Sequence, residues 1–252
     1  MELKIPAPVR LQKISYLLVM ALLQMLVVST LTVSAWAAQV ATLENVSGDV
    51  RIYSEGKNRG RKGMDGASLL SKHIVKTEGD DAFADIVFAD GSRVRVMPNS
   101  AVYLSKVEIN EGGSEIDMKL AAGKIFNVVN KLSKNSRYTV NTQTAIAGVK
   151  GTVFSVEAVS DDKAVFMVKE GRVEASNSNQ PDKTVEVSDL HKTTVNKDNP
   201  PEEPVEMTAE EIAMFNLLDD IFKTIGSDIQ EKIQDDVMQQ LRESGGDFLN
   251  LQ

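Results

Sequence analysis

Short runs of alternating apolar and polar residues, separated by Gly, Asp or Asn, fill the chain from residue 40 to residue 195. In the run of residues 92–96, Val94 and Val96 face one side of a strand and Arg93 and Arg95 face the other. The period of two predicts β-strands, and turn residues recur about every 8–12 positions. We therefore expect about a dozen short strands and no convincing helix in this region.

Two of these runs carry more specific predictions. Asp90-Gly91 predicts a hairpin turn, because Gly accepts a positive φ without steric cost. Residues 164–168 are apolar throughout and predict a strand that is covered on both faces. The fold class is mainly β, with many short strands in a β-solenoid-like, barrel or sandwich domain, and no fixed repeat length decides among them.

The pattern changes after residue 197. Residues 198–207 contain three prolines and predict a Pro/Glu-rich linker. Thr208 and Glu211 then have the spacing of a capping box, and apolar residues recur every three or four positions on either side of Gly226. We expect residues 208–252 to form a tail of two acidic amphipathic helices, separate from the β domain, that docks weakly or binds a partner.

The N-terminal segment predicts export. Lys4, Arg10 and Lys13 precede an uncharged apolar run over residues 14–33, and Ala35-Trp36-Ala37 follows. This order is typical of a signal peptide, here residues 1–37, with cleavage after Ala37 and a β domain over residues 38–197. About 20 apolar residues can also span a bilayer, so an uncleaved inner-membrane anchor is the alternative. The rest of the chain is then periplasmic or secreted, or faces the periplasm from that anchor.

Composition and charge narrow the chemistry. The 252 residues include no Cys and two His, which excludes disulfides, Cys-ligated metals, a thiol nucleophile and a multi-histidine metal site. Residues 38–197 have a net charge of +1, whereas residues 198–252 hold 3 basic and 14 acidic residues. The acidic tail argues against binding of nucleic acid or anionic lipid at that end. We expect no nucleic-acid partner, and membrane contact only through an uncleaved N-terminal segment.

Several local patterns suggest sites but favour structural interpretations. Residues 148–152 lack the residue order of a phosphate-binding loop and precede a strand, so we expect a tight turn that places Phe154 in the core. Neither paired carboxylates nor a nucleophile with its base stands out. The aspartates near residue 85 lack the spacing of a calcium loop, and Asp85 is expected to point outward from its strand; these are Asp80, Asp81, Asp85 and Asp90. We expect no enzyme activity, and no catalytic, metal-binding or cofactor-binding residue.

One loop concentrates positive charge. Lys57, Arg59, Arg61 and Lys62 lie within six consecutive residues. A contact with a polyanion, such as lipopolysaccharide phosphate or an acidic glycan, is one interpretation. A solvated loop without a ligand is the other.

Separated motifs between residues 40 and 195 resemble those of the FecR domain. Residues 142–154 resemble its signature Thr-x-x-Ala-x-x-x-Val-Arg-Gly-Thr-x-Phe, with Lys150 at the position of the Arg. Gly48-Asp49-Val50, Thr77, Asn99-Ser100 and residues 120–125 resemble further family motifs. The residues that carry the resemblance most strongly are Asp90, Gly91, Ser92, Gly123, Val149, Lys150, Gly151, Thr152, Phe154 and Gly171. The resemblance implies structural roles for them, a FecR-like fold and a bacterial envelope location.

The best-known members of this family are inner-membrane regulators with a cytosolic anti-sigma segment and a βαβ module after the domain. Here 13 residues precede the apolar run, and the C-terminal pattern is helical. We therefore interpret the chain as an exported, non-catalytic envelope protein whose FecR-like domain binds a protein or an envelope polymer along a strand edge or sheet face. The alternatives are a signalling component that senses an outer-membrane receptor and regulates a sigma factor, and a glycan-active envelope enzyme.

Overall fold

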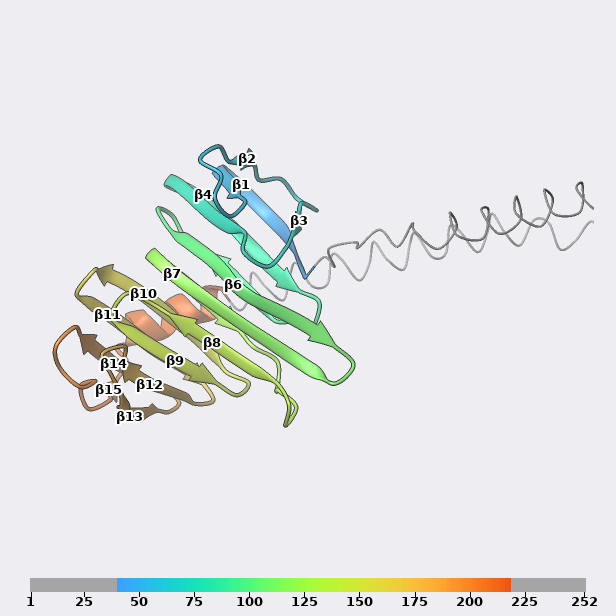
Figure 1. Cartoon of the computed structure of the whole chain (residues 1–252). Helices are drawn as coiled ribbons and strands as arrows, with labels where there is room; N and C mark the ends of the chain where they lie inside the picture. The colour runs from blue at the N-terminus through green and yellow to red at the C-terminus, as the bar shows by residue number, and fades with distance from the viewer. Residues whose placement is uncertain (1–39, 219–252) are drawn as a thin grey trace, which may run out of the picture. The chain divides into compact units, whose positions relative to one another are not determined.

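The computed structural model describes residues 40–218, which belong to the second of two compact units, residues 39–252 (Figure 1). The segment expected to be a signal peptide or anchor lies outside the described residues, as does the second helix expected in the tail. Among residues 40–218, no helix is long and apolar enough to cross a membrane.

The described part of the chain is mainly β, as predicted. The expectation of short strands is wrong for residues 41–53, 74–88 and 113–128, which form strands of 13, 15 and 16 residues. Its 15 strands belong to a single hydrogen-bonded sheet. The strands are β1 Ala41–Tyr53, β2 Arg61–Lys62, β3 Ser68–Leu69, β4 Ile74–Phe88, β5 Arg93–Val96, β6 Ala101–Asn110, β7 Gly113–Val128, β8 Arg137–Asn141, β9 Ala145–Val149, β10 Val153–Ser160, β11 Lys163–Glu170, β12 Val173–Asn177, β13 Gln180–Val187, β14 His191–Asn196 and β15 Val205–Glu206.

Strand β7 joins the two parts of this sheet. Its first half pairs with β6 and, in parallel, with β8, where Ile116 lies opposite Tyr138. Its second half pairs with β5 and β10, where Ile125 lies opposite Val156. From β7 the sheet continues through β8, β9 and β12 to β13, and through β10, β11 and β14 to β15. Strands β1 to β6 attach to β7 through β5 and β6.

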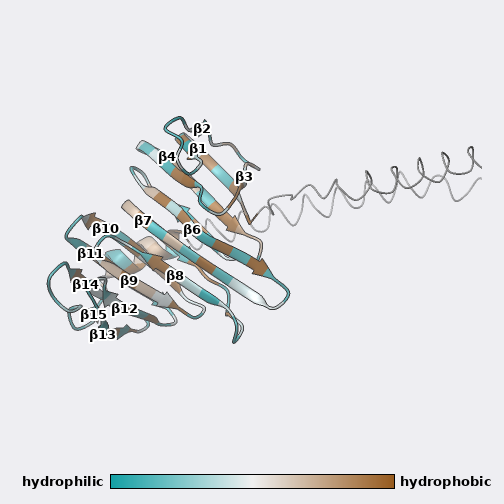
Figure 2. Cartoon of the chain, in the orientation of Figure 1, coloured by the Kyte–Doolittle hydropathy of each residue, from teal (hydrophilic) through white to brown (hydrophobic). Residues whose placement is uncertain are grey.

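The main hydrophobic core collects the apolar residues of one face of these strands. Figure 2 shows apolar and polar residues alternating along β6 and β7, which is the pattern that the sequence predicts. Phe154 is fully buried, as expected, and its ring packs edge-to-face on Tyr138 with the ring centres 6.3 Å apart. The Tyr138 hydroxyl donates a hydrogen bond to Asn127 Oδ1 at 3.0 Å, and burial raises the pKa of this hydroxyl well above its ordinary value.

A second, smaller cluster covers the other face of β7, β10 and β11. Phe126 of β7 and Met167 of β11 pack there against residues 207–218, and Phe126 meets Phe215 edge-to-face with ring centres 5.1 Å apart. Val168 meanwhile faces the main core. The prediction that residues 164–168 are covered on both faces is therefore confirmed, because main core and helix each cover one face. The second cluster consists of Phe126, Met167, Met207, Phe215 and Leu218, with Met97, Val153, Val165, Ile212 and Met214 packed against it.

The start of the C-terminal tail packs on the sheet, which is one of the two alternatives expected for it. Strand β15, within the expected linker, pairs with β14, and the helix of residues 209–218 lies against the sheet (Figure 1). The capping box forms as predicted: the Thr208 N–H donates to Glu211 Oε2 at 2.8 Å, and the Glu211 N–H donates to Thr208 Oγ1 at 3.3 Å. Lys192 of β14 also donates to Glu211 at 2.7 Å. The helix docks because its apolar stripe needs a surface and the sheet presents an apolar patch around Phe126.

We expect Phe154→Ala to lower the free energy of unfolding by about 3–5 kcal/mol, because truncation of a buried Phe leaves a cavity. The matched control is Lys150→Ala, four residues earlier on an exposed side chain, which should change stability by about 0.5 kcal/mol or less. Urea unfolding followed by circular dichroism measures both. Equal midpoints for wild type and Phe154→Ala would contradict the core assignment.

Candidate functional site

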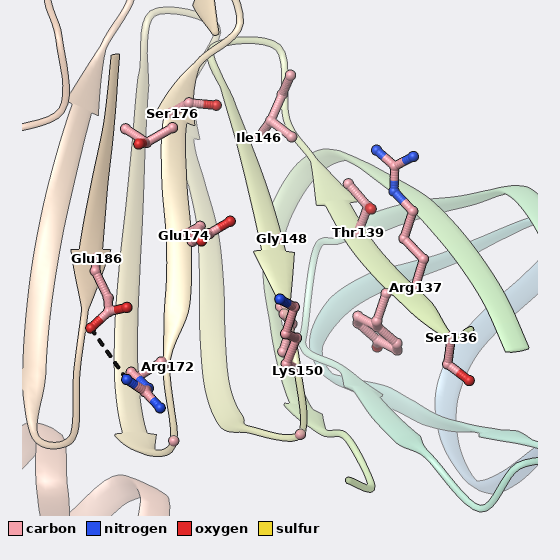
Figure 3. Close-up of a pocket in the computed structure, with 15 residues that line it drawn as sticks. Ser136, Arg137, Thr139, Ile146, Gly148, Lys150, Arg172, Glu174, Ser176 and Glu186 are labelled. Carbon is pink, nitrogen blue, oxygen red and sulfur yellow. Dashed lines mark ion pairs between the residues drawn. The ribbon is translucent and has the colours of Figure 1, made fainter. Parts of the chain in front are cut away.

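A hollow of about 640 Å³ lies on β8, β9, β12 and β13 (Figure 3). It lies on the face of these strands that points away from the main core. Its lining residues are Ser136, Arg137, Tyr138, Thr139, Ile146, Gly148, Val149, Lys150, Gly151, Gly171, Arg172, Glu174, Ser176, Thr184 and Glu186.

The middle of the hollow is a row of residues that face one another across the four strands. Thr139 lies opposite Gly148, and Gly148 lies opposite Glu174. Glu174 in turn lies opposite Glu186. Two carboxylates therefore stand directly across from each other, an arrangement that is unfavourable in an isolated sheet.

A neutral row lies two residues further along the strands. It contains Ile146, Ser176 and Thr184, which are opposite one another in the strand register. The two hydroxyls offer hydrogen-bond donors and acceptors, and Ile146 adds an apolar contact. This end of the hollow can bind uncharged groups.

A cationic row lies at the opposite end. It contains three exposed residues, each two residues along its chain from the middle row and on the same side of that row: Arg137, Lys150 and Arg172. Arg172 Nη1 is 3.8 Å from Glu186 Oε1 across an exposed pair, which is a weak contact. Within residues 40–218, neither Arg137 nor Lys150 has a carboxylate partner within 4.0 Å.

A further carboxyl group on this face belongs to β7. Asp117 lies opposite Thr139, at the margin of the hollow. Burial raises the pKa of Asp117, and the nearby Arg137 charge acts in the opposite direction. Arg137 thus also balances acidic side chains beside the hollow.

Two glycine turns in contact hold the cationic row together. The tight turn expected over residues 148–152 begins only after Val149, because Gly148 lies within β9. Gly151 has a φ of +85°, and a Cβ there would lie 2.8 Å from the Cα of Lys131. Gly171 has a φ of +92°, and a Cβ there would lie 2.8 Å from the Gly151 carbonyl oxygen. The Thr152 hydroxyl donates to the Arg172 carbonyl at 2.9 Å, and the Gly171 N–H donates to Asp189 Oδ1 at 2.6 Å. These contacts place Lys150 and Arg172 at the same end of the hollow.

The other residues of the FecR resemblance lie outside the hollow. Asp90, Gly91 and Ser92 form the predicted hairpin turn between β4 and β5: the Ser92 N–H donates to Asp90 Oδ1 at 2.9 Å, and Gly91 has a φ of +83°. Gly123 has a φ of +81° and packs on Ser100, whose hydroxyl oxygen accepts the Lys124 N–H at 2.9 Å. Four of the family residues line the hollow, namely Val149, Lys150, Gly151 and Gly171. Two others, Thr152 and Phe154, are buried.

The basic loop lies elsewhere in the sheet. The loop surrounds β2, which pairs with β1. Strand β1 is not paired with β7; it is connected to β7 through β4 and then β5 or β6. Arg61 Nη2 donates to the Ser68 carbonyl at 2.7 Å. The four cations, Lys57, Arg59, Arg61 and Lys62, are exposed. The loop and the hollow are therefore separate candidate sites.

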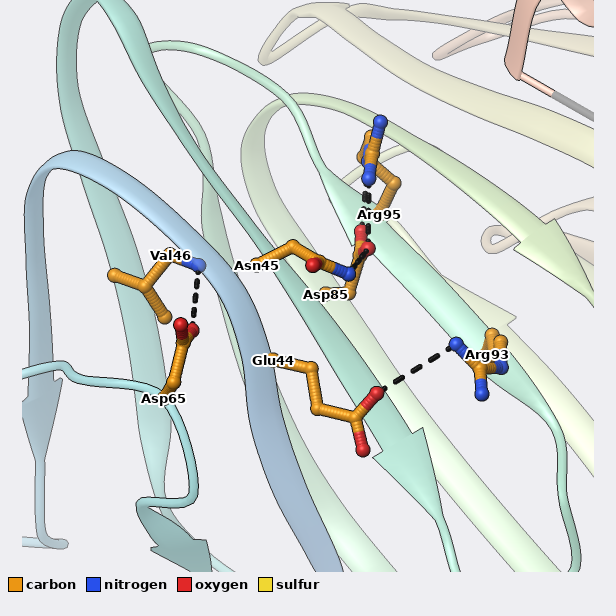
Figure 4. Close-up of polar contacts among 7 residues, drawn as sticks. All are labelled: Glu44, Asn45, Val46, Asp65, Asp85, Arg93 and Arg95. Carbon is orange, nitrogen blue, oxygen red and sulfur yellow. Dashed lines mark hydrogen bonds and ion pairs between the residues drawn. The ribbon is translucent and has the colours of Figure 1, made fainter. Parts of the chain in front are cut away.

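The expectation that Asp85 points into solvent is wrong. Its side chain is fully buried and accepts hydrogen bonds from Arg95 Nε to Oδ1 and from Arg95 Nη2 to Oδ2, both at 2.7 Å (Figure 4). Asn45 Nδ2 donates to the same carboxylate at 2.8 Å, and the Arg95 guanidinium lies 5.0 Å from the centre of the Phe83 ring. Alternation shows which residues share a face, but it does not show whether a polar face is solvated or covered.

The remaining aspartates do not form a metal site in the described structure. Within residues 40–218, no three His, Asp or Glu side chains come together as metal ligands. A turn is expected at Asp80 and Asp81, but both lie within β4, where its register with β1 shifts. Asp80 accepts a hydrogen bond from Asn99 Nδ2 at 3.1 Å.

The comparisons with known proteins agree with the resemblance drawn from the motifs. The model of the FecR protein family matches residues 74–174, so a FecR domain is confirmed for this part of the chain. Two crystal structures of a candidate anti-sigma factor from Parabacteroides distasonis ATCC 8503 are similar, with TM-scores of 0.45 and 0.46 and 18% sequence identity. Each match covers 56% of this chain, which spans 62% of the other. No curated protein matches the chain.

Sequence reasoning missed the carboxylates and two of the cations of the hollow. Arg137 and Arg172 are separated by 34 intervening residues, and β9 lies between β8, which contains Arg137, and β12, which begins directly after Arg172. Glu174 and Glu186 face each other only because β12 pairs with β13 in this register. No local motif contains them, although Arg172 follows the Gly171 of the family pattern.

We expect Gly151→Ala to destabilise the protein by about 1–2 kcal/mol or more, because an L-residue is strained at this φ and its Cβ meets the Lys131 backbone. Gly148→Ala is the matched control, since Gly148 has no positive φ and a Cβ there meets no atom within 4 Å. It should be neutral or stabilising by about 0.4–1 kcal/mol. Thermal unfolding compares the two, and equal losses would contradict this account of the turn.

We expect Asp85→Asn to cost about 3–5 kcal/mol, because it leaves the Arg95 charge buried without its counter-ion. A double variant, Asp85→Leu with Arg95→Met, should recover most of that loss, since apolar residues can replace a buried ion pair. Arg51→Ala, which removes the exposed pair with Asp49, is the control and should cost about 1 kcal/mol or less. Urea unfolding of the four proteins distinguishes these cases, and a double variant as unstable as Asp85→Asn would contradict the interpretation.

Proposed function

We propose that the chain is a FecR-type signalling component of the bacterial cell envelope. Its β domain binds a protein partner outside the cytoplasm, and that binding regulates a sigma factor. The observation that carries this proposal is the family match over residues 74–174, which includes β8, β9 and the two turns at Gly151 and Gly171 that shape the hollow. The part of the chain that resembles FecR therefore also builds most of the hollow.

Partner binding accounts for the chemistry of the hollow better than catalysis does. The hollow contains opposed carboxylates and exposed cations, but neither a nucleophile with a base nor a set of metal ligands is assembled in the described residues. Charged and hydroxyl side chains on a sheet face are suited to recognition of a complementary surface. We therefore assign this domain a binding role.

The proposal includes the compartment and the organisation of the chain. Residues 1–37 direct export as a signal peptide or inner-membrane anchor, residues 38–197 form the FecR-like domain, and residues 198–207 lead into the acidic helical tail of residues 208–252. The charge pattern of the N-terminal segment and its long apolar run support export. Docking of residues 209–218 on the sheet supports a functional connection between the tail and the domain.

A scaffold that binds an envelope polymer is the second candidate function. The exposed basic loop with Lys57, Arg59 and Lys62 favours it, because these side chains form no hydrogen bond or ion pair among the described residues and could contact phosphate or acidic sugar. The loop is remote from the hollow in the sheet order, so both functions can be tested separately.

A chromosomal deletion in the native bacterium tests the signalling proposal. We expect a group of transcripts with a shared promoter sequence to change on deletion, and to return when the wild-type chain is expressed. RNA sequencing of the three strains measures this. An unchanged transcriptome, combined with sedimentation of the purified protein with cell-wall or lipopolysaccharide fractions, would support the scaffold instead.

A further inference from the structure

Gly148 is a glycine for which the fold gives no internal reason. It lies inside β9, without a positive φ, and a Cβ there would meet no atom within 4 Å. Gly151 and Gly171, in contrast, have both a positive φ and a close neighbour. Glycine weakens a strand interior, and it often marks a place where another backbone or a ligand approaches closely. An external partner is the remaining physical reason for its position.

The missing side chain leaves an open strip of surface along β9 from Ile146 through Gly148 to Lys150, which we call the lane. The neighbours of Gly148 across the sheet are Thr139 on β8 and Glu174 on β12. Adjacent strands are about 4.8 Å apart, so the axes of β8 and β12 lie about 10 Å apart, and an extended peptide can lie over β9 between these two side chains. Ile146 lies at one end of the lane and Lys150 at the other (Figure 3).

The side chains along the lane change charge in a regular order. The first row is positive because it contains Lys150, Arg137 and Arg172. The second row is negative because it contains Glu174 and the opposed Glu186. The third row, around Ile146, is neutral. Rows two residues apart on a strand are separated by about 6.6 Å, which is also the spacing of residues i and i+2 on one face of an extended peptide.

We propose that this lane binds an extended peptide segment of a partner protein with the pattern acidic-x-basic-x-apolar, in either chain direction. The acidic residue meets Lys150 and its neighbouring cations, the basic residue meets Glu174 and Glu186, and the apolar residue meets Ile146. The proposal rests on the proposed signalling function and names the chemistry of the partner segment. It also accounts for the two opposed glutamates, because a bound cation would remove their repulsion.

A peptide fits this surface better than a uniformly charged polymer. A polyanion would be attracted by the three cations, but it would have to pass the two carboxylates of the middle row, which repel it. The basic loop, which has four cations and no carboxylate among its residues 57–62, lacks this pattern. The change of sign between successive rows of the lane therefore favours a ligand whose own charges change sign at the same spacing.

The test uses two fluorescein-labelled peptides of identical composition. One is Gly-Ser-Asp-Ser-Lys-Ser-Val-Ser-Gly, and in the other the Asp and Lys are exchanged. Fluorescence anisotropy with the purified protein should show the first binding about tenfold more tightly, because the exchange makes two attractive charge pairs repulsive. Equal affinities, or no binding of the first peptide at about 1 mM, would overturn the proposal. Tighter binding of poly-glutamate than of the first peptide would also overturn it, in favour of a polyanion.

Variants of the protein locate the binding. Gly148→Val should fill the lane and abolish binding of the first peptide while leaving the unfolding midpoint unchanged or raised, because the space is open and Val favours strands. Lys150→Glu should weaken binding about tenfold, and Lys163→Glu, the same charge change on exposed Lys163 of β11, should not. Unchanged binding by folded Gly148→Val would overturn the proposal.

The outcome separates this proposal from the signalling function. If deletion changes transcription but Gly148→Val complements it fully, the lane is not the receiving site and the signalling function stands. If the peptide binds as expected but deletion leaves transcription unchanged, the lane stands and the signalling function is wrong.

Discussion

The structure depends on the length of β7, which is 16 residues and pairs with four other strands. A strand of ordinary length would serve two neighbours, so the N-terminal strands and the C-terminal strands would form separate sheets. The side chains of β7 accordingly serve both clusters: Ile116 and Ile125 face the main core, while Phe126 supports the helix. The hollow depends on the same strand, because β8 lies parallel to it and carries Arg137 and Thr139 into position.

The two kinds of glycine at the hollow have different physical roles. Gly151 and Gly171 allow two turns to touch, which fixes the end of the hollow where the cations gather. Gly148 instead leaves space on the surface of β9. Turn glycines are required by the chain itself, whereas a strand glycine in open space leaves room for another backbone or a ligand.

The sequence predicts well whatever is encoded within one short segment. The alternation in residues 92–96, the Asp90-Gly91 turn, the burial of Phe154 and the capping box at Thr208 all follow from local pattern, and the structure contains each of them. The burial of Asp85 and the particular surface on which residues 209–218 dock do not, because each depends on a strand or surface that the local pattern does not specify. The hollow was missed for the same reason, since its rows cross four strands that are distant in sequence.

The second cluster has a chemical property that the main core lacks. Met97, Met167, Met207 and Met214 gather around Phe126 and Phe215, so the helix is attached to the sheet largely through thioethers and two aromatic rings. Thioethers adapt easily to irregular surfaces, but oxidation converts them into polar sulfoxides. The chain contains no Cys, so it has no thiol to react first. Oxidants would therefore act on the helix attachment through these methionines before they could disturb the aliphatic and aromatic interior around Phe154.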